Sequence, residues 1–129
     1  MKFSFKSILT TLVFTLSLLL AQEDLVPIYR FYSAKNKDHF YTRNASPKGE
    51  WKSQGIEFYA YPEQAEGTVP IYRFYSTKNK DHFYTKNASQ KGTWKPQGIE
   101  FYAYPEQTEG TVPIYRFYST KDKDHFYTK

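Results

Sequence analysis

The sequence predicts an all-β fold made of tandem repeats, and three observations lead to this prediction. Copies of one unit begin at Val26, Val69 and Val112, a constant step of 43 residues. The non-polar stretches of each unit are rich in Tyr, Phe, Val and Ile, which are enriched in strands. Pro, Gly, Asn and Asp separate these stretches at short intervals, as turns between strands require. A fixed period of this size is typical of an array of small structural units.

The first 21 residues indicate a secretory signal peptide. Lys2 and Lys6 precede an apolar run over residues 8–20, and Ala21 follows it. A basic start, about a dozen apolar residues and a small residue at the end are features of such a peptide. The run is short for a membrane span, which needs about 20 apolar residues; an uncleaved anchor is the alternative. We therefore expect a secreted, extracellular protein with no membrane span once the signal is removed.

Each complete unit is predicted to form a β-hairpin followed by a third strand. In the first unit, residues 26–32 and 39–42 are the two hairpin strands, and the polar turn between them contains Asn and Asp. Residues 56–61 are the third strand, introduced by Gly55. The predicted boundaries are 1–21 for the signal peptide, 22–25 for a short N-terminal segment, 26–68 for repeat 1, 69–111 for repeat 2 and 112–129 for a partial repeat 3, with 26–129 as one domain. This is either an open array or an incomplete threefold closed domain.

Alternation of side chains across a strand predicts which residues form the core. We place inward Ile56, Phe58 and Ala60 of the third strand and Tyr29 with Phe31 of the first. This choice keeps Arg30 out of the core. Trp51 and Trp94 precede the third strands, and we expect them to cap the core of each unit.

The unit also resembles a known repeat. Tyr-Arg-Phe-Tyr, a polar turn, Asp-His-Phe-Tyr-Thr and then Gly-Ile-Glu-Phe-Tyr resemble a repeat of unknown function. That repeat occurs in extracellular bacterial proteins, often beside cell-wall or glycan hydrolase domains, and in secreted fungal proteins. The resemblance covers nearly all of 26–129 and implies a secreted, lectin-like or wall-associated accessory module, without assigning ligand residues. Family members usually have three full units and a longer helical segment where this chain has 44–51.

The Asp-His pairs at 38–39, 81–82 and 124–125 raise the question of catalysis or metal binding. Adjacent residues on a strand point to opposite faces, so no pair forms a dyad within itself. Closure of the copies around an axis would bring His39, His82 and His125 together in a zinc geometry; we favour three separate histidines. Glu57 and Glu100 suggest paired carboxylates for glycoside cleavage, but solvation on a strand face is the simpler interpretation. With no cysteine, no Gly-x-Ser-x-Gly and no phosphate loop, we expect neither an enzyme nor a cofactor.

The aromatic content is the stronger functional signal. The chain has 13 Tyr, 11 Phe and 2 Trp, more rings than so small a core can bury, and Tyr tends to keep its hydroxyl near water. Exposed aromatics beside polar groups suit a sugar, so we expect a polysaccharide or glycoconjugate as the partner. The candidate ligand residues are Arg30, Tyr32, His39 and Tyr41 in the first unit and Arg73, Tyr75, His82 and Tyr84 in the second.

The sequence also bears on two other partner classes, nucleic acids and further copies of the same repeat. The net charge of +5 falls to +3 once the predicted signal peptide with Lys2 and Lys6 is removed. This mild charge is spread through the loops, unlike the clustered basic face of a nucleic-acid binder. The alternative to carbohydrate binding is a structural or adhesive protein whose repeats associate with one another.

Asn44 and Asn87 each begin an Asn-Ala-Ser sequence and are predicted N-glycosylation acceptors in a eukaryotic secretory pathway.

Overall fold

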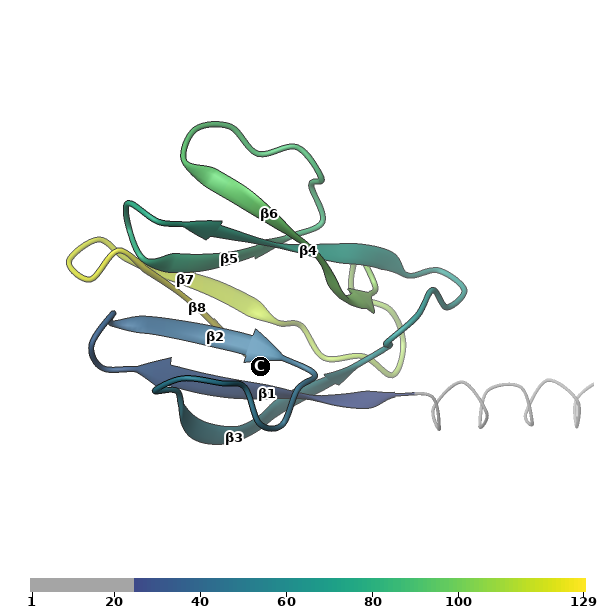
Figure 1. The fold of residues 1–129 in the computed structure, drawn as a ribbon. Helices are drawn as coiled ribbons and strands as arrows, with labels where there is room; N and C mark the ends of the chain where they lie inside the picture. The colour runs from purple at the N-terminus through teal and green to yellow at the C-terminus, as the bar shows by residue number, and fades with distance from the viewer. Residues whose placement is uncertain (1–24) are drawn as a thin grey trace, which may run out of the picture.

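A computed structural model describes residues 25–129. The predicted signal peptide lies outside these residues. Within the described part, no helix is long and apolar enough to cross a membrane. The fold is all-β, as predicted, and its strands form three separate antiparallel sheets that do not join into a closed barrel (Figure 1).

The sheets follow the repeats in order. The elements are β1 (Val26–Ser33), β2 (Asp38–Thr42), β3 (Lys52–Ala60), β4 (Val69–Ser76), β5 (Asp81–Thr85), β6 (Trp94–Ala103), β7 (Tyr115–Ser119) and β8 (Asp124–Thr128). The strand orders are β2-β1-β3, β5-β4-β6 and β7-β8. The first two units therefore place the first strand between its hairpin partner and the third strand. In the described residues 25–129, β7 pairs with β8 alone.

The hairpin turns share one local structure. In the first, the Ser33 hydroxyl accepts a hydrogen bond from the Asn36 backbone N–H at 3.2 Å, and Lys37 adopts the left-handed region with φ of 55°. Few non-glycine residues take this conformation, yet Lys80 and Lys123 repeat it at the same angle. The turn therefore ends in the same way in all three copies, and Tyr32 of the first lies directly opposite His39.

The three hairpins surround a common axis. Strands β2, β5 and β8 each contact the other two, and Figure 1 shows the hairpins side by side. The core lies between them and under the third strands. Its buried residues are Ile28, Tyr41, Phe58, Ala60, Tyr84, Phe101 and Tyr127.

The structure corrects part of the predicted core. Phe31, Phe58 and Ala60 are buried as predicted, but Ile56 is 46% exposed and Ile28 is fully buried. The β1–β3 register shifts on both sides of Tyr29, and a bulge of this kind resets the alternation of faces. The third strand also begins earlier than predicted, at Lys52 instead of 56.

Candidate functional site

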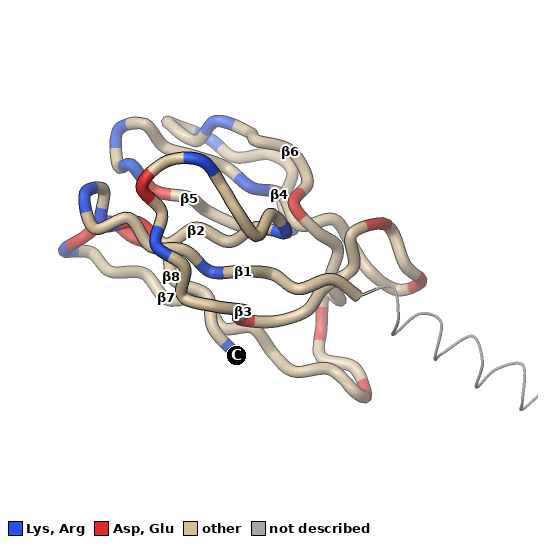
Figure 2. Tube along the Cα trace, turned by 60° about the horizontal axis from the view of Figure 1, so that its bottom comes forward, with Lys and Arg blue, Asp and Glu red and all other residues tan. Residues whose placement is uncertain are grey.

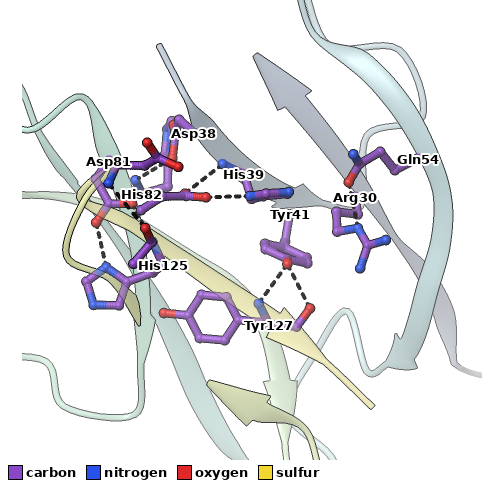
Figure 3. Close-up of polar contacts among 12 residues, drawn as sticks. Arg30, Asp38, His39, Tyr41, Gln54, Asp81, His82, His125 and Tyr127 are labelled. Carbon is purple, nitrogen blue, oxygen red and sulfur yellow. Dashed lines mark hydrogen bonds and ion pairs between the residues drawn. The ribbon is translucent and has the colours of Figure 1, made fainter. Parts of the chain in front are cut away.

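Three tyrosines meet on the axis and tie the hairpins together in a closed cycle. Figure 3 shows one link of this cycle, in which the Tyr41 hydroxyl bonds the backbone of Tyr127. The Tyr84 hydroxyl accepts a hydrogen bond from the Tyr41 backbone N–H at 2.8 Å and donates one to the Tyr41 carbonyl at 2.6 Å. In the same way, the Tyr127 hydroxyl bonds the backbone N–H and carbonyl of Tyr84. The Tyr41 hydroxyl bonds the backbone N–H and carbonyl of Tyr127. Neighbouring rings meet edge-on. Burial raises the pKa of all three phenols, so they remain neutral donors. We call this set the tyrosine ring.

A second cycle lies closer to the hairpin turns. Asp38 accepts hydrogen bonds from the backbone N–H of His82 at 3.2 Å and pairs with its Nδ1 at 2.6 Å. The other two pairs, Asp81 with His125 and Asp124 with His39, repeat both contacts. Each aspartate therefore serves the histidine of a neighbouring unit and not the one beside it in the sequence. We call this set the Asp–His ring.

The three carboxylates of the Asp–His ring are buried and close together. One oxygen from each lies within 4.8 Å of the other two. Burial, with added repulsion from Asp81 and Asp124, raises the pKa of Asp38 to about 8. Burial also lowers the pKa of His82 to about 3. At neutral pH the Asp38–His82 pair is therefore a hydrogen bond between neutral groups.

The geometry of the Asp–His ring is that of a structural link. Among the described residues, the groups close enough to share a metal ion are the three aspartates and not the three histidines, and each histidine Nδ1 pairs with one aspartate. The carboxylates could hold a cation by distance alone, but all six of their oxygens already have histidine partners. No buried side-chain polar atom within residues 25–129 lacks a hydrogen-bond partner.

Aromatic side chains gather where one unit meets the next. Between units 1 and 2, the Phe40 ring lies 5.1 Å from Trp51 and 4.7 Å from His82. Arg73 lies over Phe40 at 4.9 Å, and Tyr75 packs on His82 at 4.6 Å. Units 2 and 3 repeat this arrangement with Phe83, Trp94, Arg116, Tyr118 and His125. Units 3 and 1 meet through Phe126, Arg30, Tyr32 and His39, without a tryptophan. We call these groups the junction clusters.

Glu57 and Glu100 connect the outer strands to neighbouring units. Glu57 pairs with Arg30 at 3.0 Å and accepts hydrogen bonds from the Thr128 hydroxyl and the Lys129 N–H. Although burial opposes its ionisation, those hydrogen bonds and the Arg30 charge lower the pKa of Glu57. Glu100 pairs with Arg73 at 3.2 Å and accepts from the Arg43 N–H. The expectation of solvated carboxylates was therefore wrong, since both side chains are only 12% exposed.

The predicted ligand residues of each unit do share a hairpin face. Tyr32 lies opposite His39 and Arg30 opposite Tyr41, and directly opposed residues point the same way. That face is directed at the next hairpin, so Tyr41 and its counterpart Tyr84 are core residues with 1% and 5% exposure. A side chain so deeply buried reaches no ligand without opening the fold.

The remaining candidates lie in the junction clusters. Arg30, Tyr32, His39, Arg73 and Tyr75 keep part of their surface, whereas His82 is buried. Sequence reasoning missed Phe40, Trp51, Phe83 and Trp94 as their neighbours, because the contacts cross from one unit to the next. The signal that could have found them is the constant step of 43 residues, if closure around an axis had been assumed.

Both predicted glycosylation acceptors are exposed. Asn44 and Asn87 lie in the loops after β2 and β5, and each side-chain oxygen accepts a hydrogen bond from the serine N–H two residues on. Glycosylation at these sites stays a prediction. Figure 2 shows Lys and Arg toward the end with the hairpin turns, and several Glu on the linker loops at the other end.

The fold and the two rings define a repeat-built, all-β domain with three hairpins around one axis. The chain belongs to the family described as a domain of unknown function (DUF5648), whose model matches residues 11–93 and 86–129. No curated protein and no solved structure shows significant similarity to it.

Proposed function

We propose that this protein is a secreted, non-catalytic binding module for carbohydrate, with a cell-wall or matrix polysaccharide or glycoconjugate as the partner. The observation that carries the proposal is the repetition of the junction clusters. Each joins a tyrosine, a phenylalanine, an arginine and a histidine at the meeting of two units, and two of the three add a tryptophan. Because the two rings on the axis hold the hairpins to one another, we assign the ligand to the junction clusters.

The chemistry of the clusters suits a sugar ring. Trp51, Tyr75 and Phe40 are each partly exposed, so part of each side chain is open to solvent. The apolar face of a pyranose can stack on such a ring, since Tyr and Trp combine an apolar body with a polar tip. Arg73 lies over Phe40 at 4.9 Å and can donate to sugar hydroxyls while keeping its bond to Glu100.

The arrangement also predicts which glycan binds. One shallow cluster gives weak affinity for a monosaccharide. Related clusters on one body, held in place by the tyrosine ring, can engage successive sugars of a polymer. The second contact is then intramolecular, and avidity exceeds the single-site affinity by about 10²–10⁴.

A second function is favoured by a different observation. Tyr115, Phe117 and Tyr118 of β7 are 46–55% exposed, and aromatic patches of this kind mark interaction surfaces. This supports an adhesive protein whose copies associate with one another, in which glycan retention would be weak or absent.

The test is retention of the secreted protein on insoluble wall or matrix polysaccharides. The double variant Tyr32→Ala, Tyr75→Ala should lose retention while keeping its circular dichroism spectrum. Tyr59→Ala is the matched control, because Tyr59 is 59% exposed on β3 and belongs to no junction cluster. Retention of the folded double variant at the parent level would exclude the clusters. If the parent binds no polysaccharide and instead self-associates with rising concentration, the adhesive function replaces the proposal.

The secreted state has its own test. Intact-mass analysis of protein recovered from the medium should show a chain that begins at or near Gln22. Recovery of residues 1–21 in that material would contradict the signal-peptide prediction. In a eukaryotic host the same spectrum reports glycan at Asn44 and Asn87, with less expected at Asn44, because Pro47 directly follows that acceptor sequence.

A further inference from the structure

The lysines that the sequence distributes among its loops meet at one end of the molecule. Each hairpin turn carries two of them, and all six are exposed: Lys35 and Lys37, Lys78 and Lys80, Lys121 and Lys123. The second lysine of each turn directly precedes an aspartate of the Asp–His ring, and one carboxylate oxygen from each aspartate lies within 4.8 Å of the other two. The three turns therefore end side by side around the axis, and Figure 2 shows their basic residues at that end.

Two more lysines connect these turns to the junction clusters. Lys52 and Lys95 are exposed in the first residues of β3 and β6. Lys52 lies directly opposite Tyr32, and Lys95 lies directly opposite Tyr75. Because directly opposed residues on antiparallel strands share one face, each lysine projects from the same face as a junction tyrosine. We call the six turn lysines together with Lys52 and Lys95 the basic end.

Most of the charge of the basic end has no partner within residues 25–129. Lys35 pairs with Glu50 at 3.9 Å and Lys37 with Asp122 at 3.8 Å, both between exposed side chains, and such pairs contribute little. The other six lysines form no ion pair in the described part of the chain. The aspartates of the Asp–His ring pair with histidines. The ammonium groups are therefore free to attract an anion.

The arginines of the junction clusters already have their charge compensated. Arg73 pairs with Glu100 at 3.2 Å and donates a hydrogen bond to Gln97 at 2.8 Å. Arg30 makes the equivalent contacts in the first unit. The remaining N–H groups of these arginines suit neutral hydroxyl groups, so the recognition of an anion falls to the lysines.

The opposite end of the molecule carries negative charge. The linker loops after β3 and β6 have four exposed glutamates, Glu63, Glu66, Glu106 and Glu109 (Figure 2). The charge distribution is therefore asymmetric along the axis. A field of this kind steers an anionic chain toward the basic end and away from the linker loops.

We propose that the glycan bound by this protein is an anionic polysaccharide, whose sugar rings stack on the junction clusters while its carboxylate, sulfate or phosphate groups pair with the lysines of the basic end. This inference rests on the proposed carbohydrate binding and adds the chemical class of the ligand. A sugar stacked on Tyr75 lies beside Lys95, because the two side chains share a face. One residue of the polymer can therefore make both contacts.

An anionic polysaccharide fits these groups better than the other sources of negative charge. The linker glutamates of a second copy would bring carboxylates to the lysines but no ring to Tyr32 or Tyr75. A single-stranded nucleic acid stacks its bases on aromatic platforms. In the cluster between units 1 and 2, neighbouring rings are tilted by 32° to 67° against one another and offer no such row of parallel faces.

The test compares pairs of polysaccharides that differ in their charged groups. The pairs are polygalacturonate with its methyl ester, dextran sulfate with dextran, and phosphorylated cellulose with cellulose. The affinity of the full chain for each immobilised polymer is measured at low ionic strength, where exposed charges are least screened. At least one charged member should bind roughly tenfold more tightly than its neutral partner, because several individually weak ion pairs add up. Salt at about 1 M should remove this difference, since the Debye length is then about 3 Å.

A protein variant assigns the charge recognition to the basic end. Lys52→Gln, Lys95→Gln should bind the charged polymer roughly fivefold more weakly, as expected for the loss of two exposed ion pairs, and should leave binding to the neutral partner unchanged. Lys86→Gln, Lys129→Gln is the matched control. It removes the same charge from exposed residues that directly follow β5 and β8, at the ends of these strands away from the turns, and should bind as the parent does.

A second variant covers the case in which the first does not fold. Lys37→Asn, Lys80→Asn, Lys123→Asn removes one charge from each turn. Asparagine tolerates the left-handed backbone, with φ of 55°, at these three positions. This variant should also lose affinity for the charged polymer while keeping the thermal unfolding of the parent protein.

The outcomes separate this inference from the proposed function. Binding of no polysaccharide, charged or neutral, would contradict the proposed function and this inference with it. Equal affinity for both members of every pair, or unchanged affinity of both lysine variants, would overturn this inference alone. Full competition by polyglutamate would do the same, because that polymer carries charge without sugar rings. Tighter binding of single-stranded DNA, or self-association at low salt that the lysine variants abolish, would assign the basic end to a nucleic acid or to a second copy.

Discussion

This molecule has an inner layer of hairpins around the axis and an outer layer of third strands. The same repeat builds both layers, but they surround the axis to different extents. The inner layer consists of the tyrosine ring and the Asp–His ring, and both cycles close with one member from each of three hairpins. Within residues 25–129, the outer layer consists of β3 and β6 and covers two of the three hairpins. The hairpin half of a unit is therefore enough to close the axis, while the second half decides what remains exposed.

The exposed fractions of equivalent phenylalanines in the three hairpins show this difference directly. Phe31 and Phe74 are 3% and 2% exposed, whereas Phe117 at the same position of the third hairpin is 55% exposed. Their hairpin registers are identical, with each phenylalanine opposite Phe40, Phe83 or Phe126. The outer strand thus accounts for the burial of this position.

The largest expected effect is a difference in unfolding free energy between variants at these equivalent positions. Phe74→Ala should lower the free energy of unfolding by about 3–5 kcal/mol, the usual cost of truncating a buried phenylalanine. Phe117→Ala should cost less than about 1 kcal/mol, because half of its side chain is already in water. Urea denaturation of both variants measures the difference. Equal losses would mean that β7 is covered in solution.

A loss of stability of similar size is expected from opening the tyrosine ring. Tyr84→Phe removes the hydroxyl that bonds the Tyr41 N–H and carbonyl and leaves two buried backbone groups without partners. At about 1–3 kcal/mol for each of these two groups, we expect a loss of about 2–6 kcal/mol. Tyr59→Phe, at a position 59% exposed, is the control and should change stability by less than about 0.5 kcal/mol. A loss for Tyr84→Phe as small as this would contradict a cooperative ring.

The Asp–His ring makes stability depend on pH. The pKa of Asp38 is raised from 3.8 to about 8 and that of His82 is lowered from 6.5 to about 3. Between pH 3.8 and 6.5 the folded state holds a proton on Asp38 and the unfolded state holds one on His82, so the two effects cancel. Between pH 6.5 and 8 only the Asp38 proton remains, and stability should fall by up to about 1.4 kcal/mol per pH unit.

The variant Asp38→Asn tests this assignment. Its amide can donate to the His82 Nδ1 and its carbonyl can accept from the His82 N–H, as neutral Asp38 does. Chemical denaturation at pH 6.5 and pH 8 should show no loss in the variant. Asp122→Asn, in a partly exposed turn position, should keep the loss of the parent protein. A loss of equal size in Asp38→Asn would assign the titration to another group.

The smallest expected loss of stability comes from the Glu57 contacts that join the outer strand β3 to the third hairpin. Glu57→Gln weakens the pair with Arg30 and the contacts with Thr128 and the Lys129 N–H. We expect a loss of about 1.5 kcal/mol, the lower end of the range for hydrogen bonds to charged groups. Glu50→Gln is the control, because its pair with Lys35 is exposed and 3.9 Å long, and such pairs contribute about 0–1 kcal/mol. Thermal unfolding of the two variants should rank them in this order.

Sequence reasoning recovered the parts of the fold that are local. The constant step predicted the boundaries of the units. Turn residues between stretches rich in aromatic residues predicted the hairpins. It failed where a single irregularity reset a pattern: the register shifts around Tyr29 turn Ile56 outward and bury Ile28. Strict alternation cannot place such a bulge, although Gly55, with φ of 88°, marks its neighbourhood.

The candidate site was harder to predict because its contacts cross between units. Asp38 and His39 were correctly separated, but the true partner of Asp38 is His82 in the next copy. Tyr41 was assigned to a ligand surface because alternation places it beside Arg30. Alternation gives the face of a strand but not which face turns toward the axis. That choice depends on three hairpins meeting, which no single unit encodes.

Native-state hydrogen exchange tests most directly the claim that, within residues 25–129, the inner layer closes around three hairpins while the outer layer covers two of them. The backbone amides of Tyr41, Tyr84 and Tyr127, each bonded to a tyrosine hydroxyl, should be protected to a similar degree. The amides of β7 that point away from β8 should exchange far faster than their counterparts in β1 and β4. Equal protection of these amides in all three first strands, or loss of protection at Tyr127 alone, would contradict the account.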